Sequence, residues 1–421
     1  MELGGLYSRA EMFMCSRLAL LSFHGCPVAR LGEKDTGGMN VYVLQLAREF
    51  AAKGYEVDVF TRYHDPDDPE IVELEDGARV IHLDAGPIDA AKEDLFNYIP
   101  AFIRELYDFQ RSEETRYDVI HSHYWLSGRV GMTLSREWNV PHATTFHTLA
   151  KTKLRARAGE REPQLRQDIE ALVMSDADGI VVSTEEEKHD VVSLYKAPAH
   201  KVEVIPAGVN LDMFSPVEQG YARRELGIEE ENVILYVGRI EPLKGIDILL
   251  RAIPLLECAG DLRVLVVGGN PSGDTEMEQL KTISEELGIG DSVTFTGPVP
   301  QDRLPTYYSA ADVNVLPSHA ESFGLAALEA MACGTPVVVS RVGGLKTFVD
   351  NAKTGYLVPW RCPEAFAQRL DMLLANPDLR DAMGRAAREK ALSMGWDHVA
   401  DRMLGYYDSL APDAWSSMAG D

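Results

Sequence analysis

The stretch Leu235-Tyr236-Val237-Gly238-Arg239-Ile240-Glu241-Pro242-Leu243-Lys244-Gly245 decides the fold, because it runs from a buried strand through a turn toward a helix. The apolar run ends in a glycine and an arginine, and the apolar residues between 248 and 253 have helical spacing. Unpaired N–H groups at such a helix start attract phosphate oxygens. Arg239 can hold two oxygens in a fork, and Lys244 adds a mobile charge. This junction therefore predicts an anion site at the end of a parallel strand.

A second junction surrounds Ala320-Glu321-Ser322-Phe323-Gly324-Leu325, which precedes a predicted helix over residues 325–332. Gly324 allows a tight turn, and Glu329 follows Glu321 after two helical turns. A carboxylate accepts two hydrogen bonds, which fits the vicinal hydroxyls of a sugar. Each of these residues alone is typical of a solvated surface. The two junctions together predict a site where cations face a diphosphate and carboxylates face sugar hydroxyls.

Short apolar runs alternate with amphipathic stretches along the whole chain, which is typical of parallel sheets with helical crossovers. We expect strands at residues 18–22, 57–61, 78–83, 119–123, 142–146, 179–183 and 202–205, and, in a second series, at residues 233–237, 263–267, 292–296, 313–316, 336–339 and 355–358. The pattern pauses at residues 206–216, where we place a linker. The sequence thus predicts an α/β protein with two Rossmann-like doubly wound parallel sheets and a ligand cleft between them.

We assign residues 17–206 to the first domain and residues 207–395 to the second, and we predict an amphipathic helix over residues 396–410. Residues 1–16 read as a ragged leader and residues 411–421 as a tail. A chain of 421 residues is long enough for two cores. Five widely spaced cysteines and the lack of a long apolar run indicate a cytoplasmic protein without stable membrane insertion.

The formal net charge of −25 argues against nucleic acid as a partner. A phosphate site must therefore be a local basic island, and one exists in the first half of the chain. It consists of Lys151, Lys153, Arg155, Arg157, Arg161 and Arg166, directly after the strand end Thr145-Phe146-His147-Thr148. A second anion-prone element, Gly37-Gly38-Met39-Asn40, opens a helix predicted over residues 41–53. His121-Ser122-His123 has metal-ligand spacing but no third ligand that fits it, so we expect no metal.

The two C-terminal junctions resemble the donor site of the family 4 retaining glycosyltransferases, which have the two-domain GT-B fold. Asp35-Thr36-Gly37-Gly38-Met39-Asn40-Val41-Tyr42-Val43 resembles the loop of the D-inositol 3-phosphate glycosyltransferases within that family. The sucrose-phosphate synthases have a similar loop, usually with Gln at the position of Met39. The resemblance implies a retaining hexosyltransferase that moves glucose or N-acetylglucosamine from a UDP-sugar to a phosphorylated polyol or sugar. It also implies that no cofactor is required, that Mg²⁺ is not essential and that a homodimer can form.

Carried over residue by residue, the resemblance implies a donor site and a set of catalytic residues. The donor residues are Gly37, Gly38, Gly238, Arg239, Lys244, Glu321, Phe323, Gly324, Leu325 and Glu329. In this pattern Glu329 accepts the ribose hydroxyls, and Glu321 contacts the transferred sugar near its 3-hydroxyl. His147 bonds the 6-hydroxyl of that sugar or lies beneath its anomeric face. The catalytic residues are His147, Arg239, Lys244 and Glu321.

The resemblance also implies an acceptor site in the first domain, made of Asn40, Lys92, Tyr124, Thr148 and Arg166. The last four match the positions that hold the acceptor phosphate. The residues leave the acceptor open among an inositol phosphate, fructose 6-phosphate and an unphosphorylated molecule. A second C-terminal element, Gly343-Gly344-Leu345, resembles a further donor loop.

Three other classes are weaker. A metal-dependent single-domain glycosyltransferase would use Asp65-Pro66-Asp67-Asp68, but this segment reads as a solvated turn and leaves Arg239 and Lys244 without a role. A sugar-nucleotide binder without activity does not need the complete set of cations and carboxylates. A nicotinamide dehydrogenase would need a glycine fingerprint that the sequence lacks.

Overall fold

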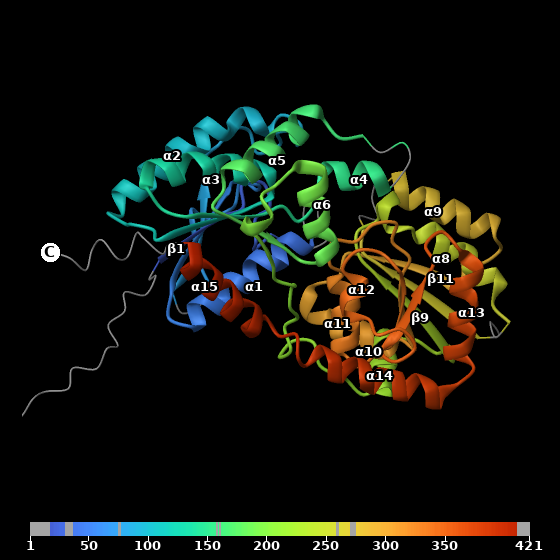
Figure 1. The fold of residues 1–421 in the computed structure, drawn as a ribbon. Helices are drawn as coiled ribbons and strands as arrows, with labels where there is room; N and C mark the ends of the chain where they lie inside the picture. The colour runs from blue at the N-terminus through green and yellow to red at the C-terminus, as the bar shows by residue number, and fades with distance from the viewer. Residues whose placement is uncertain are drawn as a thin grey trace, which may run out of the picture.

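The structure is a computed structural model that describes residues 17–29, 37–74, 77–156, 159, 161–257, 261–269 and 275–410. The expected leader and tail lie outside the described residues, as do Asp35, Thr36, Arg157, Cys15 and Cys258. Two α/β lobes stand side by side, one coloured blue to green and the other yellow to red in Figure 1. Among the described helices, none combines the length and apolar character needed to cross a lipid bilayer.

Within the described residues, the first lobe holds an eight-stranded sheet in the order β3-β4-β2-β1-β5-β6-β7-β8. Its strands are β1 (Arg17–Leu21), β2 (Glu56–Arg62), β3 (Ile71–Glu73), β4 (Ala78–Leu83), β5 (Val119–His123), β6 (His142–Thr145), β7 (Gly179–Val182) and β8 (Val202–Val204). Neighbouring strands are parallel except β3, which runs antiparallel to β4. Apart from the edge strand β3, the sheet is largely buried; strands such as β1 and β7 are apolar, whereas β5 and β6 also carry buried His, Ser and Thr side chains.

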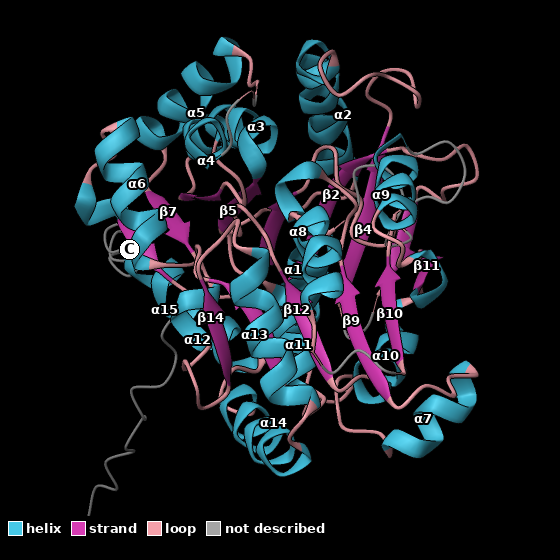
Figure 2. Cartoon of the chain, turned by 90° about the vertical axis from the view of Figure 1, so that its right-hand side faces the viewer, coloured by secondary structure: helices cyan, strands magenta, loops and turns pink. Residues whose placement is uncertain are grey.

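Helices cover both faces of this sheet (Figures 1 and 2). They are α1 (Gly38–Ala52), η1 (Leu95–Tyr98), α2 (Ile99–Ser112), α3 (Tyr124–Trp138), α4 (Ala150–Ala156), α5 (Gln164–Asp176), α6 (Glu185–Tyr195) and η2 (Ala199–Lys201). Alternate residues of β1 enter different cores, because successive side chains of a strand point to opposite faces. Leu18 and Leu20 pack with α1, whereas Ala19 and Leu21 pack with α2 and α3.

The second lobe holds, within its described residues, a parallel six-stranded sheet in the order β11-β10-β9-β12-β13-β14. The strands are β9 (Asn232–Val237), β10 (Leu262–Val267), β11 (Val293–Gly297), β12 (Val313–Leu316), β13 (Val337–Ser340) and β14 (Gly355–Val358). The helices are α7 (Gln219–Leu226), η3 (Pro242–Lys244), α8 (Ile246–Ala252), η4 (Ile253–Leu255), α9 (Thr275–Glu286), η5 (Gly290–Ser292), η6 (Gln301–Arg303), α10 (Leu304–Ala310), α11 (Leu325–Ala332), α12 (Leu345–Phe348), α13 (Pro363–Leu374) and α14 (Pro377–Ala391). Cores lie on both faces, with α8 and α13 on one side and α10 and α11 on the other.

The last helix, α15 (Trp396–Leu410), returns to the first lobe and packs beside α1 (Figure 1). The Tyr407 hydroxyl lies 2.6 Å from Nδ1 of His121, which is buried on β5. The return begins where the two connections between the lobes meet. The backbone N–H of Val209 donates to the carbonyl oxygen of Met394 at 2.9 Å, and a Cβ at Gly208 would lie 2.9 Å from the Trp396 nitrogen.

The predicted α/β class with two doubly wound sheets is confirmed, and each predicted strand matches an observed one to within one residue at either end. The domain limits at residues 206/207 and 395/396 stay predictions, although β8 ends at Val204 and β9 begins at Asn232. Two details differ. Strand β3 was not predicted, because it is a three-residue edge strand of half-buried and exposed residues. Helix α1 begins three residues earlier than predicted, because Gly38, Met39 and Asn40 are already helical.

Replacing Tyr407 with Phe should weaken the attachment of α15 to the first lobe. The change removes the hydroxyl partner of a buried ring nitrogen, which should lower the free energy of unfolding by about 1–2 kcal/mol. Urea unfolding checks this, with Tyr221→Phe as the control because the Tyr221 side chain is exposed. An unchanged midpoint in Tyr407→Phe would show that the contact contributes nothing.

Candidate active site

The cleft between the lobes lies at the switch point of each sheet, where neighbouring strands are followed by loops that part in opposite directions. In the second lobe these strands are β9 and β12, which lead to Arg239 and to Glu321. In the first lobe they are β1 and β5, which lead to His24 and to Tyr124. Residues of both lobes line a cavity of about 1290 Å³, and every predicted site residue is among them.

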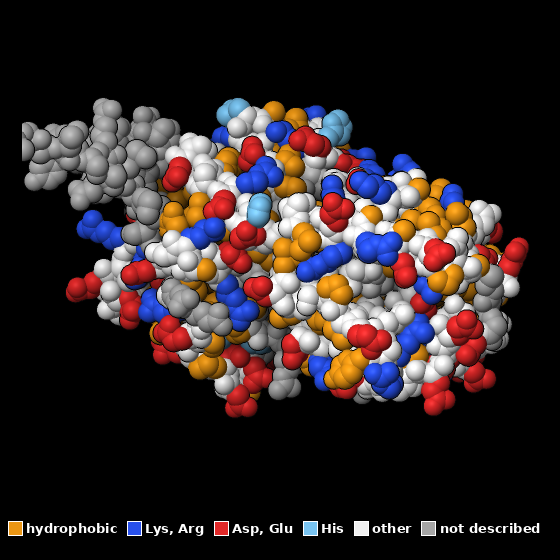
Figure 3. Space-filling model, turned by 90° about the horizontal axis from the view of Figure 1, so that it is seen from below, with side chains coloured by type: hydrophobic (Ala, Val, Ile, Leu, Met, Phe, Trp, Pro, Cys, Tyr) orange, Lys and Arg blue, Asp and Glu red, His pale blue; other side chains and the backbone are white. Residues whose placement is uncertain are grey.

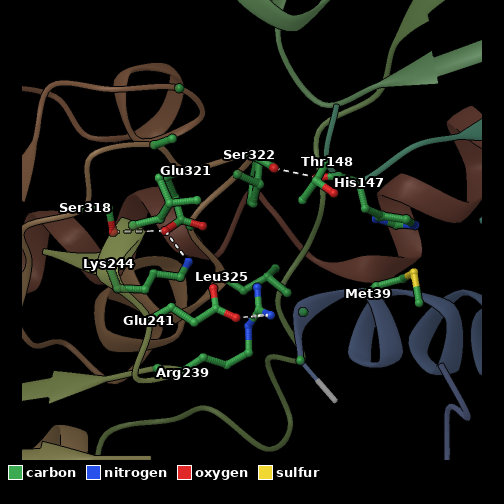
Figure 4. A pocket seen from close by; sticks show the side chains of 18 of the residues that line it. Met39, His147, Thr148, Arg239, Glu241, Lys244, Ser318, Glu321, Ser322 and Leu325 are labelled. Atoms are coloured by element: carbon green, nitrogen blue, oxygen red, sulfur yellow. Dashed lines mark hydrogen bonds and ion pairs between the residues drawn. The ribbon is translucent and has the colours of Figure 1, made fainter. Parts of the chain in front are cut away.

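The two predicted cations both face this cavity (Figure 4). The Arg239 side chain is 46% exposed, and its Nη1 atom lies 2.5 Å from Glu241 Oε1. It also reaches the opposite lobe, since a Cβ at Gly37 would lie 3.4 Å from Arg239 Nε. Lys244 donates from Nζ to Glu321 Oε2 at 2.8 Å. Each cation is thus held by a carboxylate and still borders the open volume.

The two predicted carboxylates differ in depth. Glu321 accepts from Lys244 and, at 3.2 Å, from the hydroxyl of Ser318, which orients it into the cleft (Figure 4). Glu329 is only 8% exposed, and its Oε2 atom accepts from the hydroxyl of Tyr308 at 2.8 Å. Burial raises the pKa of Glu329 to about 7, because desolvation penalises the ionised form. Glu329 can therefore titrate near neutrality.

Close backbone approaches shape the donor side. Gly245 has φ 63°, and a Cβ there would lie 2.3 Å from the Pro317 carbonyl oxygen. Gly324 has φ 101° and caps α11, with Phe323 buried on one side of it. On its other side Leu325 meets the first lobe, 3.4 Å from a Cβ position on Gly38. Glycine suits both turns because these positive φ angles are strained for other residues. Gly238 lines the same cavity at the end of β9.

The side chain of Asn40 holds the glycine-rich loop of the first lobe, at Gly37 and Gly38, in place. The Asn40 Oδ1 atom accepts from the Gly37 N–H at 3.2 Å, and its Nδ2 atom donates to the Cys26 carbonyl oxygen at 2.7 Å. The side chain is buried, although the residue borders the cavity. Asn40 therefore positions Gly37 and Gly38 opposite Arg239.

His147 lies at the junction of the lobes with a strained backbone, at φ 60°. Its Nε2 atom is 3.0 Å from His123 Nδ1, and its ring meets Tyr42 edge to face at 5.0 Å. Burial lowers the pKa of His147 to about 3, so the ring is neutral at physiological pH. The hydroxyl of Ser322, from the second lobe, donates to the His147 carbonyl oxygen (Figure 4).

Four of the five predicted acceptor residues, all except Asn40, converge at the ring of Tyr124, which also has a positive φ of 78°. The guanidinium carbon of Arg166 is 5.0 Å from the ring centre, and Lys92 Nζ is 5.5 Å from it. Arg166 donates from Nη2 to the Thr148 carbonyl at 2.8 Å and hydroxyl at 3.0 Å. The structure thus brings together four residues from four separate segments of the chain.

Much of the basic island near these residues is paired within the protein. Arg166 is buried between Glu162 and Glu170, at 2.8 and 2.7 Å. Lys153 also pairs with Glu162, and Arg155 pairs with Asp190 at 2.8 Å. Three members of the island, Lys153, Arg155 and Arg166, are therefore held in ion pairs, and Arg166 and Lys92 both line the cavity.

Two of the unpredicted residues that line the cleft are notable, His24 and Glu187. The ring of His24 lies 4.4 Å from that of Tyr124 at a tilt of 33°, and burial together with Lys92 and Arg166 holds the pKa of His24 well below the usual value. Its place directly after the first strand was a signal that could have been used. Glu187 lies in the first turn of α6, where its carboxylate accepts from the Ser183 N–H. Burial raises its pKa to about 7.

Residues of the two segments considered above as metal sites, 121–123 and 65–68, have partners within the protein. Both ring nitrogens of His121 have protein partners, Tyr407 at 2.6 Å and Thr145 at 2.9 Å. The carboxylate of Asp68 accepts from the backbone N–H groups of His64 and Asp65. The second segment is thus a turn, as predicted, and lies outside the cleft.

On the face shown in Figure 3, acidic side chains are interspersed with lysines and arginines.

Family models match both lobes. Residues 37–208 match the glycosyl transferase 4-like domain, and residues 219–390 match glycosyl transferases group 1. The D-inositol 3-phosphate glycosyltransferase of Corynebacterium jeikeium is 42% identical over 407 residues, covering 94% of this chain and 97% of that protein. The enzyme of the same name from Kribbella flavida is also 42% identical, with 93% and 95% covered.

Solved structures agree with these matches. A sucrose-phosphate synthase from Thermosynechococcus elongatus superposes with a TM-score of 0.87 at 36% identity, covering 94% of this chain and 99% of that one. An Anabaena protein in complex with UDP and glucose shares the fold, with a TM-score of 0.74 at 16% identity over 94% of this chain and 100% of that one. The chain therefore belongs to the group 1, family 4 glycosyltransferases with the GT-B fold and is a hexosyltransferase.

Proposed function

We propose that this enzyme moves glucose or N-acetylglucosamine from a UDP-sugar to a hydroxyl of a phosphorylated polyol, with D-inositol 3-phosphate as the preferred acceptor type. The observation that carries the proposal is the convergence of Lys92, Arg166 and Thr148 around Tyr124, across the cleft from Arg239 and Lys244. Two separate groups of cations in one cavity suit two phosphorylated substrates. The relatives that are 42% identical carry the name of this activity.

The donor half would use charge in the way a departing diphosphate requires. Arg239 and Lys244 neutralise the negative charge that grows on the pyrophosphate as its bond to the sugar breaks. Lys244 is held by Glu321 before the donor binds, so a phosphate can take over the ammonium while Glu321 turns to a sugar hydroxyl. Glu329, deeper in the cleft, would accept the ribose hydroxyls.

The transfer would proceed with retention, the acceptor hydroxyl approaching from the face that the diphosphate leaves. His147 is neutral and lies where the lobes meet, so it suits a hydrogen bond to the sugar rather than attack on it. The departing phosphate would then take the acceptor proton. Contacts such as Ser322 with His147 join the lobes and exclude water, which limits hydrolysis of the donor.

We also propose that transfer needs no added divalent cation, since Arg239 and Lys244 supply the countercharge. The rate of product formation by the desalted enzyme can be measured with and without added Mg²⁺ or Mn²⁺. Equal rates would support the proposal. Activity that appears only with an added ion would contradict it.

A second acceptor is favoured by one observation. The solved sucrose-phosphate synthase is 36% identical over 94% of this chain. Fructose 6-phosphate would use the same phosphate contacts and differ in the hydroxyl presented to the donor. Product formation from UDP-glucose and UDP-N-acetylglucosamine with each phosphorylated acceptor, and with free inositol and fructose, separates the candidates. Transfer to the unphosphorylated acceptors at equal efficiency would overturn the phosphate assignment.

Removal of the positive side chain of Arg239 or Lys244 should slow the chemical step of sugar transfer. Arg239→Ala or Lys244→Ala should lower kcat by about 10²–10³, because each cation stabilises charge that develops in the transition state. The control is Arg303→Ala, an arginine outside the cleft that pairs with Glu225. Steady-state kinetics that show the same loss in the control, or no loss in the two variants, would contradict the donor assignment.

The Lys92→Ala variant tests whether these residues bind the phosphate of the acceptor, and it does so with less risk to the fold than Arg166→Ala. Truncation of Arg166 would leave Glu170 buried without its cation, so the fold itself would suffer. Lys92→Ala should raise KM for the phosphorylated acceptor about 10-fold or more and leave slow hydrolysis of the UDP-sugar unchanged. An equal loss of both activities would show that Lys92 does not serve the acceptor.

Donor binding should weaken as the pH falls through about 7, the pKa of Glu329 in the free enzyme. The ribose hydroxyls bind the ionised carboxylate, so protonation competes with the donor, and KM for UDP-glucose should rise about tenfold from pH 8 to pH 6. His147, with a pKa of about 3, does not titrate in this range. Glu329→Gln should flatten the profile, and an unchanged slope in that variant would assign the effect elsewhere.

A further inference from the structure

A second cluster of chemically capable side chains lies in the first lobe outside the cleft. It consists of Cys26, His64 and His82, none of which lines the cavity. Cys26 follows β1, His64 follows β2 and His82 lies on β4, and these three strands are neighbours in the sheet. One potential ligand atom from each residue lies within 4.8 Å of the other two.

The histidine of β4 is already oriented as a ligand. Its Nδ1 atom lies 2.7 Å from the Pro69 carbonyl oxygen, which can only accept a hydrogen bond, so the proton of the neutral ring sits on Nδ1. The lone pair on Nε2 therefore points toward Cys26, whose sulfur is 3.3 Å away. A backbone carbonyl that fixes the tautomer of a histidine is the usual outer partner of a metal-bound imidazole.

The third residue has a carboxylate beside its ring. His64 Nδ1 lies 2.7 Å from Asp68 Oδ2 but makes no directional hydrogen bond to it. Asp68 is itself fixed, because the same oxygen accepts from the backbone N–H groups of His64 and Asp65 at 3.0 and 2.9 Å. The His64 and His82 rings stack with their centres 6.0 Å apart. A carbonyl oxygen thus holds the His82 ring, and a fixed carboxylate lies beside the His64 ring.

The protein encloses most of the cluster. Cys26 is 3% exposed and His82 is 2% exposed, whereas the His64 side chain is 32% exposed. A hydrogen bond between the Cys26 thiol and His82 Nε2 involves two members of the cluster and does not involve His64. A divalent ion would contact all three residues.

We propose that Cys26, His64 and His82 form a Zn²⁺ site that anchors the loop after β1. One thiolate and two imidazoles are ligands that Zn²⁺ prefers, and a water can complete a tetrahedral site. The Cys26 carbonyl accepts from Asn40, so the bound ion connects β2 and β4 to the start of α1 and to the glycine-rich loop. The site is structural, since its ligands lie outside the cleft.

Metal analysis of the full-length protein tests this proposal. Protein purified with Zn²⁺ and without chelator, then desalted, should retain about one zinc per chain. Cys26→Ser and His82→Gln should lose it, while Cys362→Ser, the control at a half-buried cysteine elsewhere, should keep it. Zinc content that is negligible in the unaltered protein, or the same in Cys26→Ser, would overturn the proposal.

Two further measurements do not depend on the folding of ligand variants. Co²⁺ added to the unaltered, metal-stripped protein should give a thiolate-to-metal charge-transfer band that Zn²⁺ abolishes. Asp68→Asn keeps all three ligands and should weaken Zn²⁺ binding about 10–100-fold, as measured by competition with a chromogenic chelator. The absence of a Co²⁺ band would show that the thiol–imidazole hydrogen bond alone accounts for the cluster.

Discussion

The donor site depends on one constraint: β9 and β12 are neighbours in the sheet, and the loops that follow them run in opposite directions. Arg239 and Lys244 follow one strand and Glu321 follows its neighbour, so a cation and a carboxylate from distant parts of the sequence meet at 2.8 Å. The chain has a formal net charge of −25, so carboxylates are plentiful. Positively charged side chains that lie close together stay oriented when each has a carboxylate or solvent as its partner. The pairing keeps both groups beside the cavity.

Residues in short motifs at strand ends could be placed from the sequence, because a parallel strand fixes where its carboxyl end lies. That holds for Arg239, Lys244 and Glu321, and for the glycines that allow close approach. His24 also follows a strand end and could have been placed in this way, whereas Glu187 is a single residue whose burial depends on segments far along the chain. The strained φ of His147 and the ion pairs of the basic island are also products of tertiary packing. Strand β3 shows the same limit, because a short edge strand has too few buried residues to leave a pattern.

The first lobe combines two different uses of buried polar groups. Around Tyr124, Arg166 is enclosed by Glu162 and Glu170, which compensate its charge. Around His121 and His123 the rings are neutral, because burial lowers both pKa values and no carboxylate compensates. The histidines beside His147 are thus uncharged, in contrast to the cations around Tyr124.

The hydrogen bond between Val209 and Met394 has a consequence for how the lobes can move. The chain crosses between the lobes twice, and the two crossings are fastened to each other at this point. Two adjacent connections that are bonded to each other form a hinge. A hinge of this kind permits rotation of one lobe about a single axis and resists sliding or twisting of one lobe over the other. Whatever angle the cleft opens to, Gly37 and Arg239 would part and meet again along the same arc.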